Sequence, residues 1–441
     1  MQRMTIIGGG ESGLGAALLG TQKGYEVFLS DAGVIDKEIR NQLIDQHIPF
    51  EERGHTLEMF VGADFIVRSP GVPGNVPVLV ASGELNIPVI SEIEFGYRHY
   101  SGFIIGITGS NGKTTTTGLT YHILSEAGIP VSVGGNFGTS FCRILAEGSD
   151  KPVIVLELSS FQLEDIMDFR PSVAMILNIS ADHLDRYGND IRRYAGAKFQ
   201  ITRNLRESDL FIFNADDPMI KEMTGKSNIH CKELPVRAED YENGIWSKDL
   251  DTYFDIGLPG KHNLFNAFCA ISAARNLEVP DIIIQSALKT FRNQAHRMEY
   301  CGEMDGVRFY NDSKATNVDA VQYALDAFQE PVVWIAGGTD KGNDYSLLIP
   351  KVSGRVKALI CLGLDNTKLK SAFASVVDVI EETQSMKEAV NMAFRHAEKG
   401  AVVLLSPACA SFDLFRNYED RGWQFKNAVE KLKREKEEYS E

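Results

Sequence analysis

Residues 108–115, TGSNGKTT, are the stretch that decides the fold of this chain. They follow an apolar segment, residues 103–107, which is expected to be a strand, and they precede a helical pattern that ends near Gly128. Glycines let such a loop curl so that successive N–H groups face an anion, and the N-terminus of the following helix adds its positive dipole end. The strict phosphate-loop pattern has a glycine five positions before Gly112, where this chain has Ile107, so only the compact form GxxGKTT is present. We favour nucleotide binding over a plain turn that carries a surface lysine.

This loop predicts roles for individual residues. The Lys113 ammonium would reach the β- and γ-phosphates of a nucleotide, and the Thr114 hydroxyl would ligate Mg²⁺. The residues predicted to bind the nucleotide phosphates are Gly109, Ser110, Asn111, Gly112, Lys113, Thr114 and Thr115.

A second glycine-rich turn lies near the start of the chain. Residues 8–13 have GxGxxG spacing after an apolar strand pattern, and Asp31 comes about 20 residues later, after a second strand. Three interpretations stay open: an NAD(P) site, a site for another pyrophosphate ligand such as a UDP-sugar, and a purely structural turn. We favour the UDP-sugar type, because the next nucleotide loop follows too soon for a full dinucleotide domain. Ser12 is then a candidate phosphate contact.

Two further polar groups follow strands near the nucleotide loop. Glu157 ends the apolar run at residues 153–156, and an acid at the carboxyl end of such a strand is well placed to hold a metal. His183, in NISADHLD at residues 178–185, offers a neutral nitrogen to a metal. Either residue alone is equally well explained as an ordinary strand end or a loop histidine, but their occurrence with Lys113 favours a metal–nucleotide site.

The composition bounds the class of protein. At about 150 residues per domain, 441 residues suggest three domains, and three α/β segments open near residues 1, 92 and 293. A formal charge of −15, from 45 basic and 60 acidic residues, argues against a nucleic-acid or anionic-membrane binder. No apolar run is long enough for a membrane span, and the start of the chain does not have the pattern of a signal peptide. The six cysteines are never spaced as CxxC, which indicates neither a disulfide framework nor a zinc site, and we expect a cytoplasmic protein.

With these motifs in order, the chain resembles the Mur ligase family, the ATP-dependent amino-acid ligases of peptidoglycan precursor synthesis. The resemblance covers essentially the whole chain. It rests on SPGVP (69–73), TGSNGKTT (108–115), ELSSFQ (157–162), NISADHLD (178–185), YAGAK (194–198), GKHNLFNA (260–267), HRME (296–299), NDSKATN (311–317), GGTDK (337–341) and SPACASFD (406–413). The nucleotide loop and the histidine–asparagine stretch mark the superfamily, while SPACAS and the SPG turn favour its D-glutamate-adding branch.

The resemblance implies an α/β fold with three domains. These would be a Rossmann-like domain for the UDP-sugar at residues 1–91, a central P-loop-type ATPase domain with a mostly parallel sheet at residues 92–292, and a Rossmann-like ligase domain with amino-acid and ATP contacts at residues 293–441. The implied chemistry joins D-glutamate to UDP-N-acetylmuramoyl-L-alanine: ATP phosphorylates the carboxylate, the amine attacks the acyl phosphate, and a tetrahedral intermediate expels phosphate. A monomer that binds neither nucleic acid nor membrane is expected.

The resemblance also implies roles for particular residues. Thr114 and Glu157 would hold one Mg²⁺ on the β- and γ-phosphates. His183 and Lys198 would hold a second, with Lys198 carbamylated, because an ammonium is a poor ligand and a carbamate oxygen suits a hard metal. The implied catalytic residues are Lys113, His183 and Lys198. The further implied ATP contacts are Asn266, Arg297 and Asp312, and the implied contacts to the UDP-sugar and to D-glutamate are Ser12, Gly71, Asn136, Lys314, Thr316, Lys341, Ser411 and Phe412.

Other interpretations stay open at this point. The nearest is another ligase of the Mur or folylpolyglutamate type. An NAD-dependent oxidoreductase built on the first glycine turn would leave Lys113, Glu157 and His183 unexplained, and a phosphate-loop switch or motor would hydrolyse ATP without any amino-acid acceptor. One position departs from the family pattern: Ala32 and Gly33 stand where a well-known form has threonine and arginine against uridine, so those uracil contacts cannot be carried over.

Overall fold

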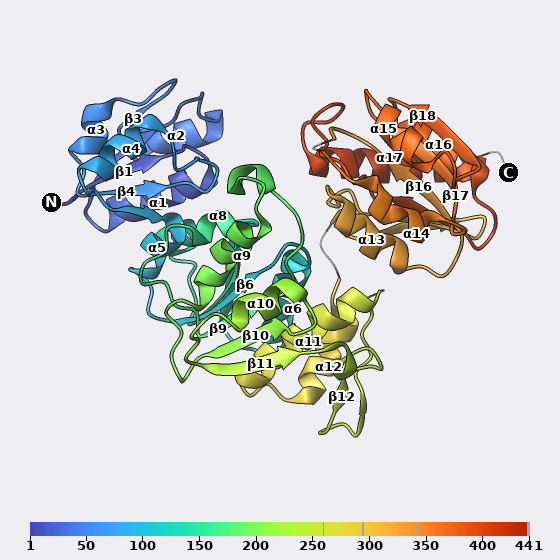
Figure 1. The fold of residues 1–441 in the computed structure, drawn as a ribbon, viewed down its shortest axis with the longest axis horizontal. Coiled ribbons are helices and arrows are strands. Elements are labelled where there is room, and N and C mark those ends of the chain that lie inside the picture. Colours follow the sequence, from blue (N-terminus) through green and yellow to red (C-terminus); the bar gives the residue numbers. More distant parts are fainter. Residues whose placement is uncertain (259, 293–294, 341, 439–441) are drawn as a thin grey trace. The chain divides into compact units, whose positions relative to one another are not determined.

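The computed structural model describes residues 1–258, 260–292, 295–340 and 342–438, and it separates into two compact units (Figure 1). The first unit comprises residues 1–255 and 265–290, and the second comprises the described parts of residues 256–264 and 291–441. Parallel sheets flanked by helices confirm the α/β class predicted from the sequence. The division into three domains at residues 91 and 292 stays a prediction. Within the described ranges, no helix combines the length and the apolar character that crossing a membrane requires.

The amino-terminal part of the first unit is a five-stranded parallel sheet with the order β3-β2-β1-β4-β5. The order reverses between β1 and β4, so the carboxyl ends of these strands border the crevice in which open sheets bind ligands. The elements are β1 (Arg3–Ile7), α1 (Glu11–Gln22), β2 (Glu26–Ser30), α2 (Lys37–Asp45), β3 (Phe50–Glu51), α3 (Leu57–Val61), β4 (Phe65–Arg68), α4 (Pro77–Glu84) and β5 (Val89–Ser91).

The rest of the first unit is built on a six-stranded parallel sheet with the order β11-β10-β9-β6-β8-β7. The expected strands at residues 103–107 and 153–156 are present as β6 and β8, which are neighbours at the centre of the sheet. The elements are α5 (Glu92–Tyr97), β6 (Phe103–Thr108), α6 (Lys113–Glu126), β7 (Val131–Gly135), α7 (Phe141–Ala146), β8 (Val153–Glu157), α8 (Ser160–Leu163), β9 (Val173–Ile176), the 3-10 helix η1 (Leu184–Tyr187), α9 (Ile191–Phe199), η2 (Gln200–Thr202), β10 (Leu210–Asn214), α10 (Pro218–Thr224), β11 (Lys232–Val236), η3 (Ala238–Asp240), a hairpin of β12 (Trp246–Ser247) and β13 (Thr252–Tyr253), α11 (Lys261–Asn276) and α12 (Asp281–Thr290).

The second unit carries a six-stranded sheet with the order β14-β15-β19-β16-β17-β18. Its edge strand β14 runs antiparallel to β15, which adds an antiparallel pair to the Rossmann-like domain expected here. The reason is local: Asp305 and Gly306 both have positive φ, 53° and 77°, which is the geometry of a tight hairpin turn. The elements are β14 (Glu299–Met304), β15 (Val307–Asn311), α13 (Val318–Asp326), β16 (Val332–Ala336), η4 (Tyr345–Leu348), α14 (Ile349–Val352), β17 (Val356–Leu362), α15 (Thr367–Phe373), β18 (Val379–Thr383), α16 (Met386–His396), β19 (Val402–Leu405) and α17 (Tyr418–Glu438).

The two sheets of the first unit share one apolar core. Leu14 of α1 and Phe141 of α7 are fully buried in the same cluster, and the two helices pack closely. A Cβ on Gly15 would lie 2.3 Å from Ser140 Oγ, so only glycine allows this approach. The crevices at the carboxyl ends of both sheets therefore belong to one compact unit.

Candidate active site

The nucleotide loop joins β6 to α6 and is fixed from the neighbouring strand β9. Asn178, just beyond β9, accepts from the Asn111 N–H at 2.8 Å and donates to the Asn111 carbonyl at 3.0 Å. Gly112 has φ +84° and Gly109 has φ +154°, which lets the loop curl as the motif predicts. Asn111 Nδ2, Thr108 Oγ1 and Ser180 Oγ are buried and have no hydrogen-bond partner among the described residues. Buried polar atoms of this kind are expected to be satisfied by a polar ligand.

Two lysines converge on this loop. Lys113 Nζ donates to the carbonyls of Gly109 and Ser110 at 2.8 and 2.9 Å, and Lys198 Nζ donates to the same Gly109 carbonyl at 2.8 Å. Lys198 is 1% exposed and lies 4.4 Å from the centre of the Tyr194 ring. Burial, and then the charge of Lys113, hold the pKa of Lys198 well below its ordinary value. The buried position therefore favours the unprotonated amine of Lys198 more than an exposed lysine would, which its place on a helix does not reveal.

Glu157 ends β8 at the same edge of the sheet and is 2% exposed. Its Oε1 accepts from Asn136 Nδ2 at 2.9 Å, and its backbone carbonyl accepts from the Asn136 N–H at 2.8 Å. Glu157 and Asp182 both act on Lys198 through their charges, so these residues lie close together. The predicted substrate residue Asn136 and the predicted metal residue Glu157 thus meet in one place.

His183 stands in the loop after β9, in a left-handed conformation with φ 52°. Its side chain is half-exposed and contacts Asp182 at 3.7 Å and the Phe161 ring at 5.2 Å between centres. A cavity of about 1160 Å³ is lined by His183 together with the predicted substrate residue Gly71. From the sequence, Asp182 or Asp185 could orient His183 or pair with cations; in the structure Asp182 contacts His183 and also acts on Lys198 through its charge.

A divalent metal fits this set of side chains without being enclosed by it. The described residues hold no group of three His, Cys, Asp or Glu side chains in metal-binding proximity. Mg²⁺ in nucleotide enzymes is commonly held by one or two carboxylates together with substrate phosphates and water. Glu157 at the strand end and the Thr114 hydroxyl in the first turn of α6 supply ligands of that type.

Asn266, in α11, lies directly beneath the nucleotide loop. It is 3% exposed, and a Cβ on Gly112 would stand 2.6 Å from its Oδ1. Gly112 is therefore required both for its positive φ and for the close approach of the asparagine. This arrangement brings the implied adenine-side asparagine to the phosphate loop.

The first glycine turn is closed by an acid. Asp31 accepts from the Gly9 N–H and the Gly33 N–H, both at 2.6 Å, so each oxygen of its carboxylate binds a backbone amide. This differs from the dinucleotide interpretation, in which that acid faces a ribose hydroxyl. Gly33, which replaces a uridine-contacting residue of the family pattern, has a structural partner in Asp31. Ser12 is half-buried in the first turn of α1.

The second unit gathers several of the implied ATP and D-glutamate residues. Asp312 is 5% exposed and accepts from Ser406 Oγ at 3.0 Å and from the Met298 N–H at 3.2 Å. Burial raises its pKa to about 7, against an opposing effect of the Arg297 charge. Ser411 is buried, Lys314 is half-buried, and Thr316 and Phe412 are exposed, while Lys341 lies outside the described residues.

Arg421 is a residue of this region that the sequence predictions missed. It is 1% exposed, and its guanidinium donates to Ser313 Oγ at 3.0 Å, the Ser313 carbonyl at 2.8 Å and the Cys409 carbonyl at 3.1 Å. It therefore ties the NDSKAT segment to the SPACAS segment. No signal in a charged terminal helix distinguishes this buried arginine from its exposed neighbours.

Comparisons with known proteins identify the family of this chain. The profile of the MurD N-terminal domain matches residues 3–78, that of the Mur ligase middle domain matches residues 107–274, and that of the Mur ligase glutamate ligase domain matches residues 296–409. The chain therefore belongs to the Mur ligase family, and the resemblance in its motifs is confirmed.

Individual relatives and solved structures show which members of the family this chain resembles. The chain is 45% identical over 444 residues to UDP-N-acetylmuramoylalanine–D-glutamate ligase of Christiangramia forsetii, covering 98% of this chain and 100% of the relative. It is 46% identical over 447 residues to the protein of the same name from Cytophaga hutchinsonii, covering 98% and 99%. Among solved structures, UDP-N-acetylmuramate–alanine ligase MurC of Thermotoga maritima has a TM-score of 0.61 at 19% identity, covering 98% of this chain and 100% of that one. MurF ligase of Thermotoga maritima has a TM-score of 0.61 at 16% identity, covering 92% and 95%. These two structures establish the fold alone.

Proposed function

We propose that this chain joins D-glutamate to UDP-N-acetylmuramoyl-L-alanine with ATP, a step of peptidoglycan precursor synthesis. One observation carries the proposal: two lysines and a buried carboxylate converge at the nucleotide loop of a chain that matches D-glutamate ligases over nearly its whole length. The products are an amide, ADP and phosphate.

The first step is phosphoryl transfer from ATP to the carboxylate of the sugar-linked alanine. Two anions must approach inside a chain of net charge −15, so their repulsion has to be cancelled locally. Lys113 supplies positive charge to the terminal phosphates, and the loop amides and the N-terminus of α6 supply further donors. Thr114 and Glu157 would hold Mg²⁺, which supplies Lewis-acid charge to the phosphate oxygens when it is bound.

Lys198 is proposed to be carbamylated and, with His183, to serve a second Mg²⁺ position. The neutral amine nitrogen of Lys198 attacks the carbon of CO₂, a C–N bond forms, and the nitrogen loses one proton to solvent. The low pKa of Lys198 supports this step, because only the unprotonated amine is nucleophilic. The carbamate then offers oxygen donors, which hard cations prefer.

The second step is attack of the D-glutamate amine on the acyl phosphate. The amine nitrogen forms a bond to the acyl carbon, the tetrahedral intermediate expels phosphate, and the nitrogen gives up a proton. The residues proposed to bind D-glutamate are Lys314, Thr316, Lys341, Ser411 and Phe412. Arg297 and Asp312 are proposed to contact the nucleotide, and Ser12, Gly71 and Asn136 the UDP-sugar. We further propose that the enzyme works as a monomer in the cytoplasm, where ATP and a UDP-linked precursor are available; sedimentation measures the oligomeric state.

The test is acceptor-dependent phosphate release by purified protein with ATP, Mg²⁺ and UDP-N-acetylmuramoyl-L-alanine. We expect release only with D-glutamate, and a product heavier by one glutamate residue. Preference for L-lysine or diaminopimelate would indicate another Mur-type ligase. Hydrolysis that ignores every amino acid would indicate a phosphate-loop switch instead.

A further inference from the structure

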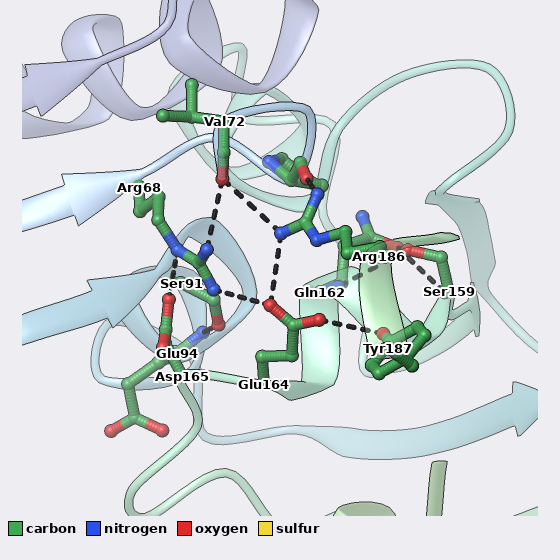
Figure 2. Close-up of polar contacts among 11 residues, drawn as sticks. Arg68, Val72, Ser91, Glu94, Ser159, Gln162, Glu164, Asp165, Arg186 and Tyr187 are labelled. Carbon is green, nitrogen blue, oxygen red and sulfur yellow. Dashed lines mark hydrogen bonds and ion pairs between the residues drawn. The ribbon is translucent and has the colours of Figure 1, made fainter. Parts of the chain in front are cut away.

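Four charged side chains meet where the two sheets of the first unit join (Figure 2). All four line the cavity that Gly71 and His183 also line. Arg68, at the end of β4, lies 2.5 Å from Asp165 and 2.7 Å from Glu164. Arg186, in η1, lies 3.0 Å from the same oxygen of Glu164. Two basic and two acidic side chains thus link the two parts of the unit.

Glu164 is the centre of this cluster. Its second oxygen accepts from the Tyr187 hydroxyl at 2.7 Å. Burial would raise the pKa of Glu164, but the hydrogen bonds from Tyr187 and Arg68 lower it below its ordinary value, so the carboxylate is ionised at neutral pH. Both guanidiniums therefore have a fixed anionic partner.

Arg186 also reaches the turn that contains Gly71. Its Nη1 donates to the Pro70 carbonyl at 2.6 Å, and its Nη2 donates to the Val72 carbonyl at 3.3 Å. Arg68 donates to the same Val72 carbonyl at 3.0 Å, and Figure 2 shows both guanidiniums directed at it. The carbonyls on either side of Gly71 are thus held by one side chain from the other part of the unit.

The same guanidinium also connects to the His183 loop. The central carbon of the Arg186 guanidinium lies 4.1 Å from the centre of the Phe161 ring, and Phe161 meets the His183 ring edge-on. Arg186 itself belongs to the 3-10 helix that His183 begins. Arg186 thus contacts both the Pro70 carbonyl and the Phe161 ring.

We propose that Arg186 is a positioning residue that sets the spacing between the Gly71 turn, which would hold the sugar-linked substrate, and the His183 loop, which would serve the phosphoryl-transfer site. The inference rests on the proposed function for the identity of the two substrates. A planar guanidinium can bind two carbonyls and a carboxylate while it stacks on a ring, whereas an ammonium is a single point charge. Arginine is therefore required here for geometry as well as for charge.

The test compares Arg186→Lys and Arg186→Ala with the wild type. We expect kcat/KM for UDP-N-acetylmuramoyl-L-alanine to fall about 10²-fold in Arg186→Ala, because a displacement of about 1 Å has effects of that size. The KM for ATP should stay within about twofold, since the contacts of Arg186 among the described residues go to Pro70, Val72, Glu164 and Phe161. Guanidinium ion at low millimolar concentration should restore part of the activity of Arg186→Ala, and none of that of Arg186→Lys.

The matched control is Arg170→Ala. Arg170 is a part-buried arginine that pairs with Asp209 at 3.2 Å, but it lies before β9, at the opposite edge of the sheet from the site. Its loss should lower the melting temperature and leave both KM values unchanged. Parallel changes in the KM values of both substrates, the same pattern in Arg170→Ala, or no change in Arg186→Ala would each overturn the inference.

Calorimetry separates this inference from the proposed function. If the wild type binds UDP-N-acetylmuramoyl-L-alanine but shows no ligation, the proposed function is wrong, and the Kd shift in Arg186→Ala still decides the role of Arg186. If the wild type does not bind that compound at all, both are overturned.

Discussion

The two glycine turns of the first unit follow the same plan and differ in charge. Both lie between a parallel strand and the N-terminus of a helix. In the first turn the Gly9 N–H is bound by Asp31, and the helix that follows begins with another acid, Glu11. The helix after the second turn is α6, and all of its residues are described. It has no acidic residue at its N-terminal end, where Lys113 and Lys198 both donate to the Gly109 carbonyl.

This difference indicates what each turn can do. An acidic turn lowers the attraction that its helix dipole offers to an anion, so it can anchor a pyrophosphate but adds little charge for chemistry. At the second turn, Lys113 can stabilise charge that moves during phosphoryl transfer. Glycine spacing sets the shape of both turns, while side chains delivered from other strands and helices set their function. The predictions below test this contrast.

The largest expected effect is at the second turn. Lys113→Ala should lower turnover by about 10³-fold, because it removes a positive charge from the terminal phosphates in a water-poor site. The melting temperature should stay close to that of the wild type. Lys221→Ala, which changes an exposed lysine of α10, is the matched control and should retain full turnover. Retained activity in Lys113→Ala would mean that the loop has been misassigned.

Lys198→Arg should lower turnover by about 10²-fold, since an arginine cannot be carbamylated. Mutating a group that supports a metal site lowers metal affinity or activity by up to about 100-fold. With ¹³C-bicarbonate, the wild type should show one carbamate carbon resonance that is missing in the variant. Acidification should weaken the resonance and the turnover together, because protonation of the amine opposes carbamate formation. The role of Lys198 would be contradicted if the wild type showed no such resonance, or if the variant kept normal turnover.

At the first turn, Asp31→Asn should raise the KM for the UDP-sugar about tenfold and leave the KM for ATP unchanged. An asparagine is neutral and has one acceptor oxygen, so one of the Gly9 and Gly33 amides keeps only a neutral acceptor and the other loses its acceptor. A hydrogen bond to a charged group contributes about 1.5–3 kcal/mol. Initial rates over both substrates measure this. Tight binding of a nicotinamide cofactor by the wild type, lost in the variant, would favour the oxidoreductase alternative.

The fold could be predicted from the sequence where strands are central and apolar. The segment at residues 103–107 and the run before Glu157 became β6 and β8, whereas β7 and β11 escaped prediction. Both are edge strands: β7 ends in two glycines, and β11 contains Pro235 and is largely exposed. Such segments lack the continuous apolar run by which buried parallel strands are identified.

The site was predictable as a set of motifs but not as a geometry. The sequence places Lys113 on a loop and Lys198 on a helix, and nothing local shows that both side chains meet at the Gly109 carbonyl. Asp31 fits the spacing of a ribose-binding acid, yet both of its oxygens bind backbone amides. Arg421 is buried only because two distant segments need one donor group. Each of these outcomes depends on tertiary contacts that residue spacing does not encode.

The smallest expected effect lies in a buried contact behind the first turn. Glu92, at the start of α5, is 1% exposed and accepts from the Cys142 N–H of α7, the helix against which α1 of the first turn packs. Burial raises its pKa to about 7 from an ordinary 4.5. Between pH 4.5 and about 7, Glu92 therefore keeps a proton in the native state that it has released in the unfolded state. The stability contributed by Glu92 is complete below pH 4.5 and is lost as the pH rises through 7.

Glu92→Gln keeps the acceptor oxygen and removes this titration. The free energy of unfolding of the variant, relative to the wild type, should therefore increase between pH 5.5 and 8.5, by at most about 3 kcal/mol. Urea unfolding at several pH values measures this difference, and turnover at neutral pH should be unchanged because Glu92 lies outside both turns. A difference that stays constant with pH would show that the carboxylate is not protonated in the native state. Glu92 would then be a buried negative charge close to Glu11. The acidic surroundings of the first glycine turn would in that case continue into the core between α1, α5 and α7.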